Sequence, residues 1–388
     1  MKAFVFETTK SIVSEIGAIK HIATICNKLN IAKPLIVTDQ GIVDCGLLTS
    51  IMSSLNDANI SAQIFSDVSA DPQDALIERV VEFAQQHAVD GVIGFGGGSS
   101  MDTAKLVALL ASSDEQLQDI YGIEQIKGER FPLVLIPTTA GTGSEVTPIA
   151  IVTTGETTKA GVVSAKLLPD VALLDAELTL KLPAHVTAAT GIDAMVHAIE
   201  AYTSAIKKNP YSDLLAKQAL QLLSENIVEA TFNGKNLAAR QAMLLGACLA
   251  GQAFANAPVA AVHALAYPLG GHFHIPHGLS NSLVLPHVLR FNISAASELY
   301  AQLAPFIDNT ICMSQSQQQI THALIDYIAK LIKQLNLPTS LKYLGVKYAD
   351  LDTLANDAML QTRLLVNNPK PVNLADAKDI YLLAYKGF

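Results

Sequence analysis

The chain has 388 residues, of which 50% are apolar and 16% are charged, a composition that excludes a disordered chain and is typical of a globular protein. Its formal net charge of −9 argues against nucleic acid or an anionic membrane surface as a partner, because both attract clusters of Lys and Arg. A single hydrophobic core rarely organises more than about 250–300 residues, so the length predicts two domains.

The cysteines and the apolar segments indicate the cellular compartment of the protein. The four cysteines are far apart and form no C-x-x-C pair, which argues against a disulfide framework and favours a reducing compartment. The apolar run at the N-terminus is too short for a signal peptide. Residues 242–262 carry no charge, but they are rich in alanine and predict a buried core helix rather than a membrane span. We therefore expect a cytoplasmic protein.

The first part of the chain alternates apolar runs with helical patterns. Residues 74–88 place their large apolar side chains on one face and predict an amphipathic helix. Alternation of strands and helices is typical of a parallel sheet with helices on its faces. The runs that we expect to form buried strands are residues 35–38, 92–95, 133–136 and 171–174.

The pattern changes after Leu182 and Pro183. Long helical stretches follow, with few β-rich runs, and residues 214–223 and 320–335 are examples of predicted helices. We therefore expect an α/β domain over residues 1–183 and an all-helical domain over residues 184–388.

A glycine-rich segment follows the strand predicted at 92–95. Its three consecutive glycines let a backbone approach a phosphate, and Ser99 or Ser100 can cap the helix that follows. The free N–H groups at that helix start favour an anion, so the segment predicts a pyrophosphate site. A tight structural turn is the alternative, because the usual G-x-G-x-x-G spacing is absent.

Two further polar segments follow predicted strands. Asp39 comes after the strand at 35–38, where a carboxylate can accept a hydrogen bond from a ribose 2′-OH and disfavours a 2′-phosphate. That position favours NAD over NADP, with a helix-capping aspartate as the alternative. Residues 137–147 contain four threonines, a serine and two glycines, which suit contacts to ribose, phosphate or carboxamide groups.

The helical part contains a candidate metal site. Asp193 and His197 are four residues apart, so they share one face of a helix, although a buried hydrogen bond would explain the pair as well. Residues 241–289 contain no Asp, Glu, Lys or Arg, yet they hold five of the ten histidines. Buried imidazoles need polar partners, and these residues include no carboxylate that could pair with them. A first-row ion such as iron or zinc would serve as a shared partner of several imidazoles.

Four sequence motifs occur in order along the chain: residues 96–105 (GGGSSMDTAK), 137–147 (PTTAGTGSEVT), 191–200 (GIDAMVHAIE) and 263–281 (HALAYPLGGHFHIPHGLSN). Together they resemble the iron-containing (group III) alcohol dehydrogenases, and the resemblance covers nearly the whole chain. The resemblance implies a Rossmann-like N-terminal domain, an all-α C-terminal domain of the dehydroquinate synthase-like fold, and a cleft between them.

The same resemblance implies the site residues. It implies Fe²⁺, with Zn²⁺ as the alternative, on Asp193, His197, His263 and His277. It implies that Phe254 lines a substrate pocket and that the protein is a homodimer or a larger homo-oligomer. The residues that it assigns to NAD are Asp39, Gly97, Gly98, Ser99, Asp102, Thr138, Thr139, Thr142, Lys159 and Leu178.

The chain departs from the family at one position of interest. Many members carry a histidine where this chain has Tyr267, and that histidine is often assigned to proton relay. Tyrosine donates a hydrogen bond but is a poor base near neutral pH. We expect the catalytic relay to involve Tyr267 and His274, with His272 as an alternative to His274. The order of glycines and histidines after Tyr267 resembles a branch that includes 4-hydroxybutyrate dehydrogenases.

The expected function is therefore NAD- and Fe²⁺-dependent interconversion of a primary alcohol and an aldehyde by hydride transfer. One alternative is a hydroxyacid–oxoacid transhydrogenase that retains its NAD. A second is a metal- and NAD-dependent lyase of the same fold, which the lack of Lys and Arg in residues 241–289 disfavours. A third is a nucleotide- or metal-binding protein without catalytic activity.

Overall fold

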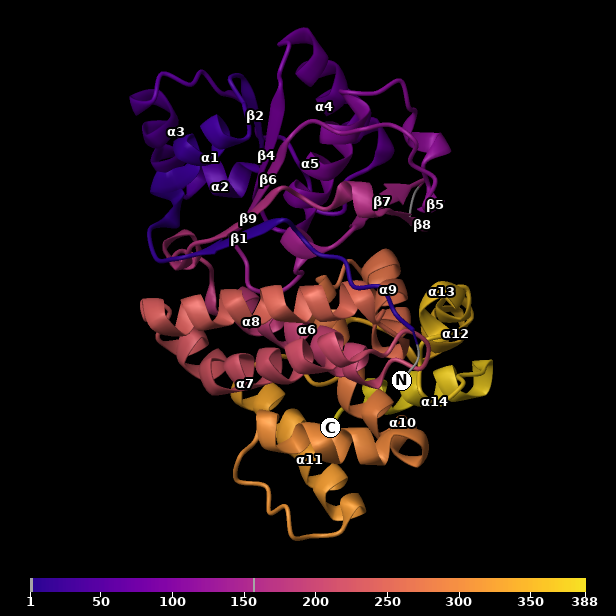
Figure 1. The fold of residues 1–388 in the computed structure, drawn as a ribbon. Helices are drawn as coiled ribbons and strands as arrows, with labels where there is room; N and C mark the ends of the chain where they lie inside the picture. Colours follow the sequence, from indigo (N-terminus) through magenta and orange to yellow (C-terminus); the bar gives the residue numbers. More distant parts are fainter. Residues whose placement is uncertain (1–2, 156–157) are drawn as a thin grey trace. The chain divides into compact units, whose positions relative to one another are not determined.

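The computed structural model describes residues 3–155 and 158–388. Its contacts divide the chain into two compact units (Figure 1). The α/β unit is Glu7–Leu182, and the helical unit joins Pro183–Phe388 to the N-terminal segment that ends at Phe6. The units differ from the predicted domains at the N-terminus, where the rings of Phe4 and Phe6 pack against Tyr211 with centroids 5.8 and 5.5 Å away.

A six-stranded parallel sheet forms the centre of the α/β unit, which confirms the predicted fold class. The four predicted strands are β2, β4, β6 and β9. They are buried along their whole length because helices cover both faces of the sheet. In spatial order the strands are β1 (Ser11–Ser14), β9 (Val171–Leu174), β6 (Leu133–Pro137), β4 (Gly91–Gly96), β2 (Pro34–Val37) and β3 (Gln63–Phe65).

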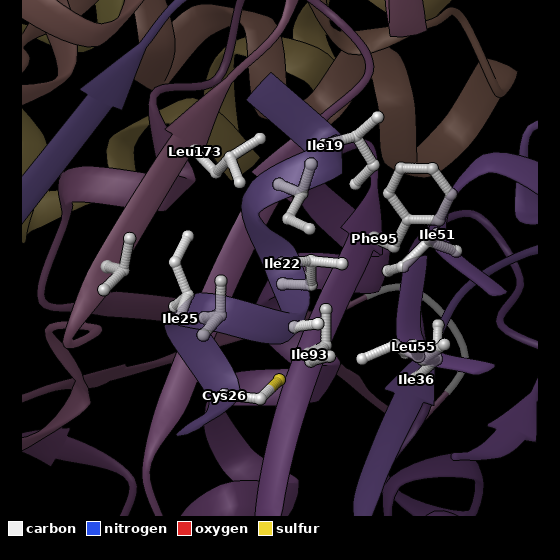
Figure 2. Close-up of a cluster of buried hydrophobic side chains, with 14 of the residues drawn as sticks. Ile19, Ile22, Ile25, Cys26, Ile36, Ile51, Leu55, Ile93, Phe95 and Leu173 are labelled. Carbon is white, nitrogen blue, oxygen red and sulfur yellow. The ribbon is translucent and has the colours of Figure 1, made fainter. Parts of the chain in front are cut away.

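Apolar side chains fill both faces of this sheet. On one face, α1 and α3 contribute Ile22, Ile51 and Leu55 to a cluster with Ile36 and Ile93 of the strands (Figure 2). On the other face, α4 and α5 pack a second cluster against the same strands. The helices of this unit are α1 (Ile22–Lys28), α2 (Gln40–Asp44), α3 (Leu48–Asp57), α4 (Asp74–Gln86) and α5 (Gly98–Leu110).

A second, three-stranded sheet lies beside α5 and was not predicted. It consists of β5 (Gly122–Ile123), β8 (Thr158–Val163) and β7 (Ile149–Thr154), with β8 in the middle. Ala150, Val152 and Val162 of this sheet pack on Leu106 and Leu109 of α5. The sheet therefore holds the segment after residues 137–147 against the helix that follows the glycines.

The helical unit consists mainly of long helices, as predicted, and polar side chains cap several of them. The Asn209 side chain caps α7, Asn236 caps α8, and Ser316 with Gln319 forms a capping box on α11. The helices are α6 (Ala184–Thr203), α7 (Pro210–Phe232), α8 (Leu237–Asn256), α9 (Ala261–Phe273), α10 (His277–Ile307), α11 (Gln317–Gln334), α12 (Leu351–Met359), α13 (Thr362–Leu365) and α14 (Leu374–Lys386).

The uncharged segment 242–262 differs from the single helix that we predicted. It is mostly buried, as expected, but the helix ends at Asn256 and α9 begins at Ala261, because Pro258 and the non-helical backbone of Ala260 interrupt it. In the described part of the chain, no single helix is long and apolar enough to cross a membrane; α8 and α9 meet that criterion only as a pair bent by 106°.

Candidate metal centre and nucleotide loops

Three helices bring four potential metal ligands together. Asp193 and His197 project from one face of α6, His263 lies near the start of α9, and His277 is the first residue of α10. One ligand atom from each residue lies within 4.8 Å of all the others. The Oδ1 atom of Asp193 is 4.0, 3.8 and 3.7 Å from the Nε2 atoms of His197, His263 and His277.

Glycine at position 278 allows α10 to start so close to α6. A Cβ atom on Gly278 would lie 2.4 Å from the carbonyl oxygen of Ala189, which is backbone and cannot yield. The first turn of α10 can therefore reach α6 only if residue 278 has no side chain. This contact places His277 beside Asp193.

The electrostatics of the group suit a cation. Burial raises the pKa of the Asp193 carboxyl, but the three histidines and a hydrogen bond from Asn281 outweigh burial, so the net effect lowers this pKa. The Asn281 side chain donates to Asp193 Oδ1 over 2.5 Å. Asp193 is therefore an anion held among imidazoles whose Nε2 atoms face it.

The chemistry and spacing of the donors fit one divalent first-row ion. One carboxylate oxygen and three imidazole nitrogens are borderline ligands that suit iron and zinc. Tetrahedral bonds of about 2.1 Å separate ligand atoms by about 3.4 Å. The measured separations from Asp193 Oδ1 are slightly wider, so small side-chain shifts would close the group around an ion.

Two aromatic side chains border this group. The ring of Phe254 stacks on His197, with centroids 4.3 Å apart and planes at 23°. The ring of Tyr267 lies 5.8 Å from that of His277. The side chain of His277 is 43% exposed, so solvent reaches the group at this ligand. The structure thus places the predicted substrate residue and one predicted relay residue next to the ligands.

The other predicted relay residues have different surroundings. His274 is exposed and ends α9 in a left-handed conformation with φ of 54°, where its N–H donates to Gly270. The Nε2 atom of His272 lies 2.5 Å from a carboxylate oxygen of Asp357 on α12. The ligand group therefore includes neither of these imidazoles.

The glycine segment begins α5 without a side-chain cap, which corrects the prediction that Ser99 or Ser100 caps it. The N-cap residue is Gly97, so both serines lie within the first turn. Ser100 donates instead to Asp39 over 3.2 Å, and Ser99 accepts from the N–H of Asp71 over 3.3 Å. The N–H groups at the start of α5 have no side-chain cap and suit an anion.

The glycine segment and the threonine segment lie against each other. The N–H of Thr138 donates to the carbonyl of Gly96 over 3.0 Å. A Cβ atom on Gly98 would lie 2.9 Å from the Thr142 methyl group, and one on Gly97 would lie 3.9 Å from Thr139. The two segments form a backbone-rich cradle that added side chains would narrow, which fits a bound pyrophosphate.

Asp39 caps a helix beside this cradle. One carboxylate oxygen accepts from the N–H of Ile42 over 3.2 Å, and the other accepts from Ser100. Asp39 therefore caps α2, as the alternative prediction for this residue stated. Its second oxygen, next to Ser100 at the start of α5, places the carboxylate near the predicted phosphate site.

Asp102 connects the two segments. Its carboxylate accepts from the Ser144 hydroxyl over 2.6 Å and from the N–H of Ile151 over 3.0 Å. The fully buried Lys105 donates to Ser144 over 2.8 Å and to the carbonyl of Ile149 over 2.7 Å. Both oxygens of Asp102 thus hold the two segments together, and a contact of Asp102 with the cofactor stays a prediction. Lys105 was not recognised in the sequence, since its partners are remote in the chain.

Lys159 and Leu178 complete the predicted cofactor residues. Lys159 pairs with Asp71 over 2.6 Å and donates to Thr153 over 2.9 Å, so it lies in the same network as Ser99. Leu178 is buried in the same apolar cluster as Ile22 and Ile93. A contact of Leu178 with adenine stays a prediction.

Comparison with known proteins supports a metal-dependent site in this chain, because family models and relatives match both of its units. The family model described as iron-containing alcohol dehydrogenase matches residues 9–176, and the model of the C-terminal part of the same family matches residues 187–385. The chain is 39% identical to long-chain-alcohol dehydrogenase 1 of Geobacillus thermodenitrificans over 96% of this chain and 94% of that protein. It is 38% identical to sulfoacetaldehyde reductase of Bilophila wadsworthia over 95% of both.

A solved structure agrees over the full length. The crystal structure of a 1,3-propanediol oxidoreductase superposes with a TM-score of 0.95 at 34% identity, covering 99% of this chain and all of that one. Together these matches define an oxidoreductase that acts on alcohols and aldehydes. The chain belongs to the iron-containing alcohol dehydrogenase family.

Proposed function

We propose that this enzyme interconverts a primary alcohol and an aldehyde by hydride transfer, with Fe²⁺ as its metal and NAD as its cofactor. The observation that carries the proposal is the group of Asp193, His197, His263 and His277, whose ligand atoms lie within 4.8 Å of one another. Zn²⁺ is the alternative metal, since the same ligands accept it.

The metal would be held by these four residues and, when bound, supplies a positive charge that polarises an alcohol or aldehyde oxygen. Asp193 stays ionised among the histidines, and burial keeps its charge from being screened by water. Phe254 stacks on His197 and presents an apolar surface that suits the carbon chain of a substrate. The exposed edge of His277 leaves a route for substrate to the group.

NAD, when bound, supplies the ring that accepts or donates the hydride. The uncapped start of α5 would hold its pyrophosphate, and Thr138, Thr139 and Thr142 would contact the phosphate and sugar groups. The carboxylate of Asp39 would accept from the ribose 2′-OH and repel a 2′-phosphate. These assignments rest on the cradle formed by the two loops.

We assign the proton-transfer role to Tyr267 ahead of His274, because the Tyr267 ring lies beside His277 whereas His274 ends α9 at an exposed position. Tyr267→Phe should lower kcat by about 10²-fold, because it removes the hydroxyl that can donate a proton. His274→Asn, which keeps a residue that tolerates a positive φ, should leave kcat close to the wild-type value. The opposite result would transfer the role to His274.

An aldehyde panel tests the function and separates its alternatives. Reconstituted enzyme should oxidise free NADH with short and long aldehydes, and with succinic semialdehyde for the 4-hydroxybutyrate branch. A transhydrogenase would reduce an oxoacid only when a hydroxyacid is also present, without net NADH oxidation. Binding of metal and NADH without turnover of any aldehyde would instead indicate a binding protein. Light scattering of the same sample tests the expected homodimer or larger homo-oligomer, and fractionation of the source cells tests the expected cytoplasmic location.

A further inference from the structure

Glu200 belongs to the same face of α6 as Asp193 and His197, but it lies outside the ligand group. Its side chain is buried and accepts three hydrogen bonds, one from the N-cap residue of α9 and two from the first turn of that helix. One oxygen accepts from the N–H of Ala260 over 2.9 Å and from Nδ1 of His263 over 2.7 Å. The other oxygen accepts from the N–H of Val262 over 2.7 Å.

These contacts decide which nitrogen of His263 carries the proton. An ionised carboxylate accepts hydrogen bonds and cannot donate one, so Nδ1 of His263 must be the protonated nitrogen. The lone pair of the neutral imidazole is then on Nε2, which is the atom that lies 3.8 Å from Asp193 Oδ1. A ligand nitrogen needs that lone pair to bind a metal.

We propose that Glu200 is a positioning residue that fixes the tautomer and the ring orientation of His263 for metal binding, an inference that rests on the proposed metal site. Glu200 does so from the helix that also supplies Asp193 and His197, so one helix sets the direction of three of the four ligands. Carboxylate partners of ligand histidines commonly contribute 10- to 100-fold to metal affinity.

Glu200 has a structural role as well, and the test must separate the two. Ala260, the N-cap residue of α9, has no side chain that can cap the helix, so the Glu200 carboxylate accepts N–H groups at that helix start. A residue that only capped α9 would affect the free energy of unfolding. A residue that positions His263 affects metal affinity and the imidazole tautomer in folded protein.

The Glu200→Gln variant distinguishes these roles through binding of Co²⁺, used as a spectroscopic probe without NAD or substrate. The glutamine amide has one acceptor oxygen where the carboxylate has two. Its NH₂ group must therefore face a donor, either the Val262 N–H or Nδ1–H of His263, and that hydrogen bond is lost. We expect Co²⁺ affinity to fall about 10- to 100-fold and the visible Co²⁺ spectrum to change. Asp357→Asn is the matched control, because it removes the carboxylate beside His272, and it should bind Co²⁺ as wild type does.

Nitrogen-15 NMR of histidine-labelled, metal-free wild-type protein at neutral pH gives a second readout, which does not require Glu200→Gln to fold. The His263 signals, assigned by their loss in His263→Asn, should show the proton on Nδ1. A proton on Nε2, or unchanged Co²⁺ affinity and spectrum in folded Glu200→Gln, would overturn the role of Glu200 alone. Wild-type protein that binds no Co²⁺ would overturn the proposed metal site and this role together.

Discussion

The Oδ1 atom of Asp193 on α6 lies 3.8 Å from Nε2 of His263 on α9, although the two helices are separated in the chain by α7 and α8. No hydrogen atom needs to lie between these two atoms if Nδ1 of His263 carries the ring proton. The pair has the geometry of two ligands that share an ion.

Removal of one ligand should abolish metal binding and activity together. We expect His263→Ala to bind less than one Fe²⁺ or Zn²⁺ per chain and to oxidise NADH only at the background rate. The variant keeps only three of the four ligand side chains. Metal content after dialysis and activity of the same sample measure this. His322→Ala, an exposed histidine on α11, is the control, and full activity in His263→Ala would refute the ligand assignment.

Gly278→Ala should separate α10 from α6. The new methyl carbon would lie 2.4 Å from the carbonyl oxygen of Ala189. The first turn of α10 must therefore move away from α6, and His277 must move with it. We expect a loss of stability of about 1–3 kcal/mol and at least a roughly tenfold loss of Co²⁺ affinity. Chemical denaturation and Co²⁺ titration measure the two effects.

The matched control is Gly270→Ala on α9. Its added Cβ atom has no neighbour closer than 3.6 Å, so it should preserve Co²⁺ affinity and can stabilise the helix by up to about 1 kcal/mol. Equal Co²⁺ affinity in the two alanine variants would show that the close contact at Gly278 does not place His277.

The charge of Asp39 should control the choice of cofactor. Asp39→Asn keeps a side chain that can cap α2 but removes the charge that disfavours a 2′-phosphate. We expect the ratio of kcat/KM for NADH over NADPH to fall roughly tenfold, which corresponds to about 1.4 kcal/mol. Steady-state kinetics with both cofactors check this, and an unchanged ratio would count against a ribose contact.

Glu145 should make the stability depend on pH. Burial raises the pKa of its carboxyl to about 7 in the folded protein, above its usual value of 4.5. Between these values the unfolded chain releases a proton that the folded chain retains, so stability falls as pH rises from 4.5 towards 7. Above pH 7 the accumulated loss is on the order of 3 kcal/mol.

The variant Glu145→Gln carries no titrating group at this position, so it should lack this part of the pH dependence. Free energies of unfolding at pH 5 and pH 8 should therefore differ less in Glu145→Gln than in wild type. A variant with the same difference as wild type would show that the folded Glu145 carboxyl titrates normally. Glu124→Gln, in a separate loop that contacts Ser164, provides a matched carboxylate control.

Much of the fold could be predicted because its signals are local. The strands at β2, β4, β6 and β9 are continuous apolar runs, as expected when both faces of a sheet are covered. The sheet of β5, β8 and β7 was missed because its strands are short or interrupted by polar residues. The break between α8 and α9 depended on Pro258, which the helical prediction did not use as a stop.

The residues of the candidate site that belong to sequence motifs could be predicted. Contacts between residues that are distant in the chain could not. Glu200 follows Asp193 and His197 at helical spacing, so its position on the ligand-bearing face of α6 was a usable signal. Its contact with His263 depends on how α9 packs, which no local pattern encodes. The same holds for Lys105, whose partners are in the threonine loop and β7.

The most direct test of the central claim is NADH oxidation by metal-stripped protein, measured anaerobically with the best aldehyde of the panel before and after addition of Fe²⁺. We expect negligible turnover without metal and recovery that saturates near one Fe²⁺ per chain, with no recovery in His263→Ala. Equal turnover with and without metal, or Fe²⁺-dependent turnover that survives in His263→Ala, would contradict the claim that these four residues form the catalytic metal site.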